Sequence, residues 1–120
     1  MSRARDRAVA EKQGRRGEAL AGLWLRLKGW RILARRQRIG VGEVDIVARR
    51  GRTLAFVEVK WRRSGEALDL AIDARRLQRV ARAAEAIAPR FARPGDVLRI
   101  DVILLAPGRW PRHMANVWQP

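Results

Sequence analysis

The sequence predicts a single domain of the α/β class, with a helix, three strands, a second helix and a fourth strand in that order. Two segments repeat apolar residues at the spacing of a helix face. The segments between and after them are rich in Val, Ile and Phe, and turns with Gly or Pro separate them. A chain of 120 residues is long enough for one hydrophobic core of moderate size.

The first helix is predicted to run from Gly17, where an apolar stripe at positions i, i+3, i+4 and i+7 begins, to the stop at Gly29. Residues 1–16 alternate charged and small residues without such a stripe. We therefore expect a mobile basic arm there, ahead of one domain over residues 17–120. The members of the stripe are Leu20, Leu23, Trp24 and Leu27.

Three strands are predicted next, at Trp30–Arg38, Glu43–Ala48 and Thr53–Trp61. The first should carry a basic outer side and end at the turn Gly40–Gly42. Only the short turn Arg50–Arg52 separates the second strand from the third, so these two should form a β-hairpin.

The second helix should begin after Asp73, a residue type that is preferred at the N-cap, and end at Pro89. Val97–Leu105 predicts a fourth strand that is apolar enough to be buried on both faces. A short edge strand is expected in the tail that follows. The apolar stripe of the second helix consists of Leu77, Val80, Ala81, Ala84, Ile87 and Ala88.

The composition excludes several classes of protein and site. Without cysteine there is no disulfide and no thiolate-bound zinc or iron–sulfur cluster. No segment reaches the roughly 18 consecutive apolar residues of a membrane-spanning helix, and the N-terminus lacks the apolar core of a secretory signal. We therefore expect a cytoplasmic protein without a membrane partner.

The net charge of +15 indicates a polyanionic partner, foremost nucleic acid. Lys and Arg dominate residues 1–38 and 74–95. Six of the twelve acidic residues lie between these blocks, in residues 39–73. A general solubility device does not predict this clustering of acids between two basic segments.

Two carboxylates and a lysine are predicted to meet in the hairpin. Side chains two positions apart in a strand share a face, so Glu58 and Lys60 share one, and strand pairing brings Asp45 opposite one of them. Neighbouring carboxylates repel each other unless a cation lies between them, and Mg²⁺ prefers carboxylate, carbonyl and water oxygens. Asp45, Glu58 and the Val59 carbonyl are therefore candidate ligands, and Lys60 would assist a water molecule in phosphodiester hydrolysis.

An ordinary ion pair between Asp45 and Lys60, with Glu58 in solvent, explains the same spacing. The apolar neighbours of Glu58 within Phe56–Lys60 weigh against a solvated side chain. Residue spacing alone leaves both interpretations open.

Two motifs resemble the PD-(D/E)xK nuclease superfamily: G-E-V-D-I-V-A at Gly42–Ala48 and F-V-E-V-K at Phe56–Lys60. More narrowly, the chain resembles the YraN-like family of small bacterial proteins, from about Gly17 to Trp118. The further motifs of that resemblance are G-E-x-L-A at Gly17–Ala21, K-G-W-x-I-L at Lys28–Leu33, K-x-R at Lys60–Arg62, I-D-V at Ile100–Val102 and H-x-x-N at His113–Asn116.

The resemblance implies a restriction-endonuclease-like αβββαβ core, with a mixed central sheet flanked by helices, related to archaeal Holliday-junction resolvases. It implies that Asp45 and Glu58 bind the metal ion, that Lys60 is the catalytic lysine and that Glu18 completes the site. Helical periodicity by itself turns Glu18 away from the apolar stripe, as a solvated acid of the first turn. Arg36 departs from the family pattern, in which asparagine is usual.

Two groups of arginines are candidates for nucleic-acid binding. Arg62 and Arg63 directly follow the strand that carries Lys60. The others lie opposite the apolar stripe of the second helix, where a solvated face explains them equally well: Arg75, Arg79 and Arg82.

These observations predict a nuclease that depends on Mg²⁺ or Mn²⁺ and acts on structured or branched DNA. A homodimer would suit the cutting of both strands of a junction. The alternative is a non-catalytic module that retains the fold and binds nucleic acid or serves as a scaffold. Binding of divalent cations distinguishes the two.

Overall fold

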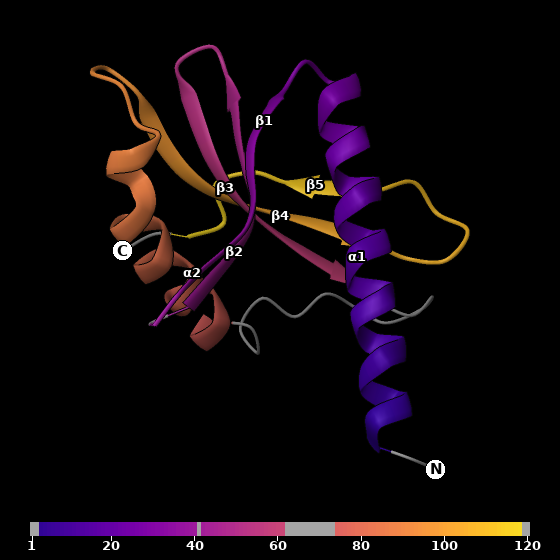
Figure 1. The fold of residues 1–120 in the computed structure, drawn as a ribbon. Coiled ribbons are helices and arrows are strands. Elements are labelled where there is room, and N and C mark those ends of the chain that lie inside the picture. Colours follow the sequence, from indigo (N-terminus) through magenta and orange to yellow (C-terminus); the bar gives the residue numbers. More distant parts are fainter. Residues whose placement is uncertain (1–2, 41, 62–73, 119–120) are drawn as a thin grey trace.

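The computed structural model describes residues 3–40, 42–61 and 74–118. Its elements lie in the order predicted from the sequence, and the short edge strand expected in the tail is present (Figure 1). They are α1 (Arg3–Leu27), β1 (Arg31–Ile39), β2 (Gly42–Arg50), β3 (Thr53–Trp61), α2 (Ala74–Ile87), the 3-10 helix η1 (Ala88–Arg90), β4 (Val97–Leu105) and β5 (Arg112–Met114).

The five strands form one mixed sheet in the order β1-β2-β3-β4-β5. Neighbouring strands run antiparallel except β3 and β4, which are parallel because the segment containing α2 returns the chain to the same end of the sheet. Helices α1 and α2 cover opposite faces (Figure 1). This confirms the α/β class and is consistent with a restriction-endonuclease-like core.

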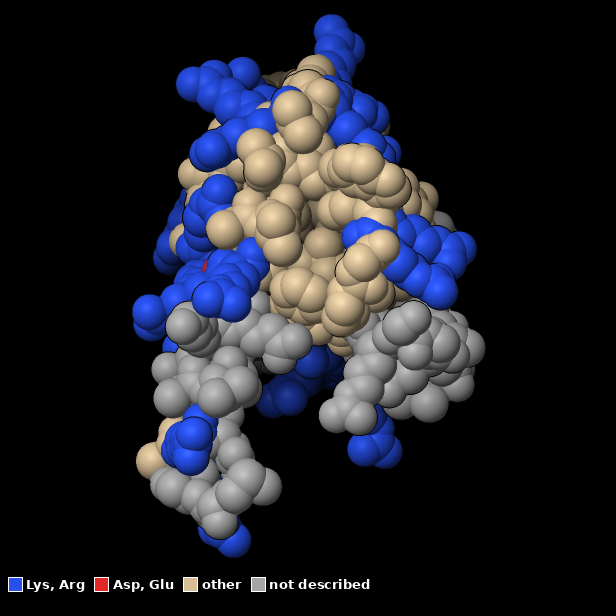
Figure 2. All heavy atoms as spheres, turned by 90° about the vertical axis from the view of Figure 1, so that its right-hand side faces the viewer, with Lys and Arg blue, Asp and Glu red and all other residues tan. Residues whose placement is uncertain are grey.

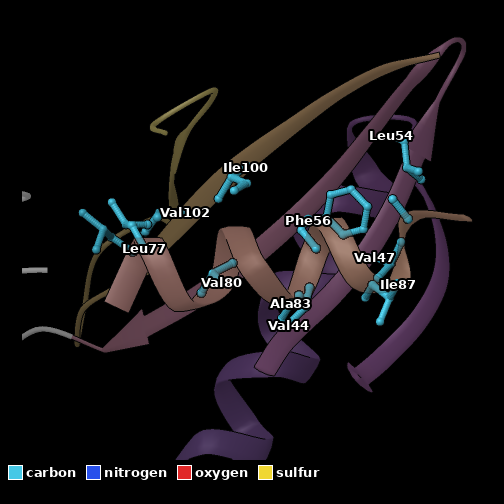
Figure 3. Packing of buried hydrophobic residues seen from close by; sticks show 13 residues of the cluster. Val44, Val47, Leu54, Phe56, Leu77, Val80, Ala83, Ile87, Ile100 and Val102 are labelled. Atoms are coloured by element: carbon cyan, nitrogen blue, oxygen red, sulfur yellow. The ribbon is translucent and has the colours of Figure 1, made fainter. Parts of the chain in front are cut away.

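Strand β3 lies in the middle of the sheet and contributes to both hydrophobic layers. Leu54 and Phe56 pack beneath α2, whereas Ala55 and Val57 pack beneath α1. On the α2 side the helix meets them with its apolar face, as Figure 3 shows. The buried residues of that helix are Leu77, Val80, Ala83, Ala84 and Ile87.

The predicted stripe of α2 is therefore confirmed with one change, since Ala83 is fully buried and Ala81 only partly. The N-cap predicted at Asp73 lies outside the described residues. At the start of β4 the prediction of burial on both faces was wrong. Val97 and Leu98 are 59% and 49% exposed, at the outer end of the sheet beside the turn between β2 and β3.

Helix α1 begins at Arg3, not at Gly17 as predicted. It therefore includes most of the segment that the sequence suggested as an arm. Ala, Arg, Glu, Lys and Gln are frequent in that segment and are strong helix formers even without an apolar stripe. The mobility of residues 1–16 stays a prediction.

The buried face of α1 also differs from the predicted one. Gly17, Ala21 and Leu25 are buried, and a Cβ atom added to Gly17 would lie 2.5 Å from the indole nitrogen of Trp61. Small residues let the helix backbone approach the sheet closely, and this approach outweighs the burial of larger side chains. The three leucines of the predicted stripe are exposed instead, Leu20 by 47%, Leu23 by 55% and Leu27 by 73%, whereas Trp24 is half-buried.

These leucines belong to an apolar area on the outer side of the molecule. Trp110 is 83% exposed, and its ring lies 5.8 Å from that of Trp24 on α1, between centroids. Figure 2 shows that Lys and Arg surround a centre of this face that is free of charged residues, and that Asp and Glu are hardly visible there. In the part of the chain that the structure describes, neither helix has both the length and the apolarity needed to cross a bilayer.

A buried aspartate fastens the C-terminal segment to β4. Asp101 is fully buried, and its carboxylate accepts hydrogen bonds from the Arg99 guanidinium at 3.0 Å, from His113 Nε2 at 2.7 Å and from the Asn116 amide at 2.9 Å. Burial alone would raise the pKa of Asp101, but the hydrogen bonds from His113, Asn116 and Arg99 together lower it. Three donors therefore hold this carboxylate in its ionised form.

Candidate functional site

The candidate site lies where β2 separates from β3. The ladder between the two strands begins at the pair Ile46–Val57. At the next position of β2, Asp45 Oδ2 accepts a hydrogen bond of 2.8 Å from the backbone amide of Val59. The side chain of Asp45 thus takes over the role of a main-chain acceptor and fixes the distance between the two strands.

Strand β1 is irregular at the same level. Arg36 has a φ of 50°, in the left-handed region that Asn and Asp enter more readily than Arg. Its neighbours in β1 pair with the two residues that flank Asp45 in β2, so Arg36 lies opposite Asp45. Side-chain alternation in β2 is interrupted here, because Val44 and Val47 both join the hydrophobic cluster beneath α2.

Asp45 and Glu58 line the same open pocket, which has a volume of about 650 Å³. The start of α2 and the turn between β1 and β2 form its walls. Its other charged lining residues are Arg38, Glu43, Arg75, Arg76 and Arg79. A second pocket of about 500 Å³ contains Glu18 and shares Arg38 with the first, so the two adjoin.

Burial raises the pKa of Asp45 from its ordinary value of 3.8 to about 6. The hydrogen bond from Val59 opposes the shift, and the negative charges of Glu58, Glu18 and Glu43 add to it. The negative charges of Glu58, Glu18 and Glu43 are therefore close enough to disfavour the ionisation of Asp45. Such a cluster attracts cations.

We expect the protonation of Asp45 to affect stability. Because the folded state binds this proton more tightly than the unfolded chain does, the contribution of Asp45 is complete below pH about 4 and is lost as the pH rises through about 6. The loss is of the order of 1 to 3 kcal/mol. Asp45→Asn should lack this pH-dependent loss. Between pH 4 and 8, thermal unfolding should therefore show the Tm of the variant rising relative to that of the wild type. A difference in Tm that is constant over this range would contradict the assignment.

Glu58 is buried, with 2% of its surface exposed. Alternation along β3 directs it to the α2 side, where Arg76 forms a salt bridge with its carboxylate. The interpretation with Glu58 in solvent was therefore wrong. Lys60 follows on the same face and is also buried, at 5% exposure.

Glu18 is directed toward β1 and not into solvent. Arg36 Nε lies 2.5 Å from Glu18 Oε2, and 14% of the glutamate side chain is exposed. The Arg35 guanidinium also donates to the Glu18 carbonyl oxygen at 3.3 Å. The prediction of a solvated acid, made from helical periodicity, was wrong because it assumed the wrong buried face of α1.

The remaining predicted residues divide into four groups. Arg75 and Arg79 line the pocket of Asp45 and Glu58. Arg82 lies elsewhere, in a pocket of about 430 Å³ bounded by α2, β4 and the C-terminal segment. Arg62 and Arg63 lie outside the described residues. The amide of Val59 is committed to Asp45, and the role of its carbonyl as a ligand stays a prediction.

Sequence reasoning did not select Arg76 or Arg38, and it noted Arg36 only as a departure from a pattern. Both Arg36 and Arg76 pair with carboxylates of the cluster. For Arg76 a weak signal existed, since it directly precedes Leu77, the first buried residue of α2. For Arg36 the pairing register of β1 is required, and the residue pattern does not supply it.

The carboxylates fit a site for a hydrated metal ion better than a site in which three protein side chains bind the ion. Within residues 3–40, 42–61 and 74–118, no three acidic or histidine side chains converge closely enough to bind one ion. Mg²⁺ commonly retains several water molecules and binds through one or two carboxylates. Asp45 and Glu58, which face one pocket, suit such a hydrated Mg²⁺ or Mn²⁺ ion.

Gly42 lets α2 pack against the start of β2. A Cβ atom there would lie 2.5 Å from the carbonyl oxygen of Arg79 and 3.5 Å from the side chain of Ala83. Gly42→Ala should therefore displace α2 and lower the free energy of unfolding by about 1 to 3 kcal/mol, measured by chemical denaturation. Gly40→Ala is the matched control, because nothing lies within 4 Å of a Cβ atom at that position. Equal stability of the two variants would contradict the expectation.

Comparison with known proteins agrees with the narrower resemblance. Residues 17–105 match the model of the uncharacterised protein family UPF0102. A UPF0102 protein of Sphingopyxis alaskensis is 67% identical over 114 residues, which cover 95% of this chain and 98% of that protein. A UPF0102 protein of Erythrobacter litoralis is 61% identical with the same coverage of both chains. The chain therefore belongs to the UPF0102 family, which its YraN-like motifs predicted.

Proposed function

We propose that the protein is a nuclease that depends on Mg²⁺ or Mn²⁺ and hydrolyses phosphodiester bonds in structured or branched DNA. The observation that supports the proposal is the pocket in which Asp45 and Glu58 lie among arginines of β1 and α2. Arginines attract the phosphate backbone, and carboxylates beside them retain a cation between protein and phosphate. The resemblance of the two strand motifs to PD-(D/E)xK nucleases supports the same activity.

Asp45 and Glu58, which line the pocket, and Lys60, which follows Glu58 on the same face of β3, have distinct roles in this proposal. Asp45 and Glu58 hold the cation, which when bound would neutralise charge on the phosphate and acidify a water molecule. Lys60 donates hydrogen bonds that orient the water or a phosphate oxygen. The oxygen of water forms a bond to phosphorus, the bond from phosphorus to the leaving oxygen breaks, and the leaving oxygen receives a proton.

The distribution of charge supports a substrate with several duplex arms. Arg75 and Arg79 line the pocket from α2, and Arg15 and Arg36 line the adjoining pocket from α1 and β1. Lys and Arg continue around the periphery of the face shown in Figure 2. Phosphate backbones that leave the site in more than one direction would each meet positive charge. Cleavage of two strands would suit a symmetric homodimer.

One observation favours a second candidate function, a non-catalytic nucleic-acid-binding or scaffold module. Glu58 and Glu18 are each engaged by an arginine, and the described carboxylates do not form a group of three around one point. A protein that has lost its metal ion would balance its buried acids in this way.

Calorimetric titration with MnCl₂, followed by a cleavage panel of branched, single-stranded and double-stranded DNA, tests the proposal. We expect Mn²⁺ binding that Asp45→Asn weakens strongly, and cleavage of branched DNA in its presence. Salt-dependent DNA binding without any Mn²⁺ binding by the wild type would instead support the non-catalytic module.

A further inference from the structure

Two carboxylates of the cluster have a guanidinium as their partner. Arg76 of α2 bridges to Glu58, and Arg36 of β1 bridges to Glu18. Both pairs join separate elements of the fold at the pockets of the candidate site. A guanidinium in this position supplies the positive charge that a metal ion would otherwise supply.

We propose that Arg36 and Arg76 are resident counter-ions of the carboxylates, that divalent cations displace them from Glu18 and Glu58 in their two adjoining pockets, and that the released guanidinium groups then bind phosphates of the nucleic acid. The inference rests on the proposed function, since it requires that the pocket accept a divalent cation.

In the pair of Arg76 with Glu58, the arginine is the partner that is able to leave. Only 3% of the Glu58 side chain is exposed, whereas 61% of the Arg76 side chain is exposed. A buried carboxylate without a cationic neighbour is costly, so Glu58 requires either a guanidinium or a metal ion beside it. Exchange of one for the other keeps this carboxylate neutralised throughout.

The backbone of Arg36 gives an independent reason to assign a special role to this residue. Its φ of 50° lies in a region that is unfavourable for arginine and easily adopted by asparagine. Residues that are held in such conformations are frequent at functional sites. The side chain of Arg36 is 36% exposed against 14% for Glu18, so the arginine is again the more accessible partner.

A displaced Arg76 would remain in the region where phosphate is expected. It lines the same pocket as Arg75 and Arg79, and each of the three is exposed. After exchange, all three guanidinium groups would be available to phosphate oxygens. Cation and DNA should therefore each raise the affinity for the other, since coupling between two ligands is reciprocal.

Calorimetry with MnCl₂ in the absence of DNA tests the exchange. Arg76→Gln and Arg36→Asn should bind Mn²⁺ about tenfold or more tightly than the wild type, because no guanidinium has to be displaced. Arg75→Gln and Arg79→Gln are matched controls, since each removes one positive charge from the same pocket without breaking the pair with Glu58. They should raise the affinity by about twofold at most.

The salt dependence of DNA binding gives a second measurement that does not depend on cleavage. With Ca²⁺ or Mn²⁺ present, Arg76→Gln should reduce the magnitude of the slope of log K against log salt by about 1 relative to the wild type. Without a divalent cation, the slopes of the variant and the wild type should agree. Arg79→Gln should lower the slope equally with and without the cation, because its guanidinium is available in both states.

The outcomes separate this inference from the proposed function. If the wild type binds Mn²⁺ through Asp45 but Arg76→Gln and Arg79→Gln shift the affinity equally, the exchange is overturned and the metal site stands. If neither the wild type nor any arginine variant binds Mn²⁺, both proposals are overturned. Tighter Mn²⁺ binding confined to Arg76→Gln and Arg36→Asn supports the exchange.

Discussion

Asp45→Asn is expected to lower the rate of divalent-dependent cleavage of branched DNA by at least about a hundredfold and to leave DNA affinity nearly unchanged. Stabilisation of charge by a bound metal ion is worth several kcal/mol, and each 1.36 kcal/mol corresponds to a factor of ten in rate. The substitution removes the charge of one proposed ligand. Single-turnover cleavage with Mn²⁺ measures the rate, and fluorescence anisotropy with Ca²⁺ measures binding.

Asparagine is preferable to alanine here because of the hydrogen bond between Asp45 and the Val59 amide. Its side-chain oxygen still accepts that bond, so the separation of β2 from β3 is retained, whereas alanine leaves the amide without this acceptor. Glu43→Gln is the matched control, because Glu43 lines the same pocket and forms an exposed pair with Arg38 at 3.3 Å. Cleavage by Asp45→Asn at the rate of the control would refute the role of Asp45.

Asp101→Ala is expected to lower the free energy of unfolding by about 3 to 5 kcal/mol, the range observed when one partner of a buried ion pair is removed. The substitution leaves Arg99 and His113 without the carboxylate that both contact, and it removes the acceptor of the Asn116 amide. Urea denaturation at pH 7 measures the effect. Because the pKa of Asp101 is lowered in the folded state, its contribution should disappear as the pH falls below the ordinary value of 3.8.

Glu85→Ala is the control for loss of one negative charge, since Glu85 is exposed on α2. It should change stability by no more than about 0.5 kcal/mol. If Asp101→Ala were as stable as this control, the network around β4 would contribute nothing to the fold.

The strands and α2 could be predicted because their signals are local. A short turn joins β2 to β3, alternation distributes the side chains of β3 between two layers, and one apolar stripe defines the buried face of α2. The face of α1 could not be predicted in this way. Helical periodicity weighs hydrophobicity, but Gly17 and Ala21 face the sheet because they permit a close approach.

Part of the candidate site was accessible from the sequence for the same reason. Alternation gave Glu58 and Lys60 a common face, and the hairpin brought Asp45 to the level of Glu58. The partnership of Arg36 with Glu18 depends on an irregularity in β1 and on the packing of α1, and that of Arg76 depends on the position of α2. Neither follows from the spacing of residues along the chain.

The exposed leucines of α1 and the orientation of Glu18 are two results of a single rotation of the helix about its axis. Contact through Ala21, in place of the predicted stripe, turns the helix by about a third of a revolution. Glu18 then points about 60° from the line of contact, toward Arg36, and no longer directly away from the sheet. If α1 buried its leucines instead, Glu18 would point away from the sheet and would not reach Arg36 in β1. The exposure of these leucines and the inward orientation of the Glu18 carboxylate therefore have the same geometric cause.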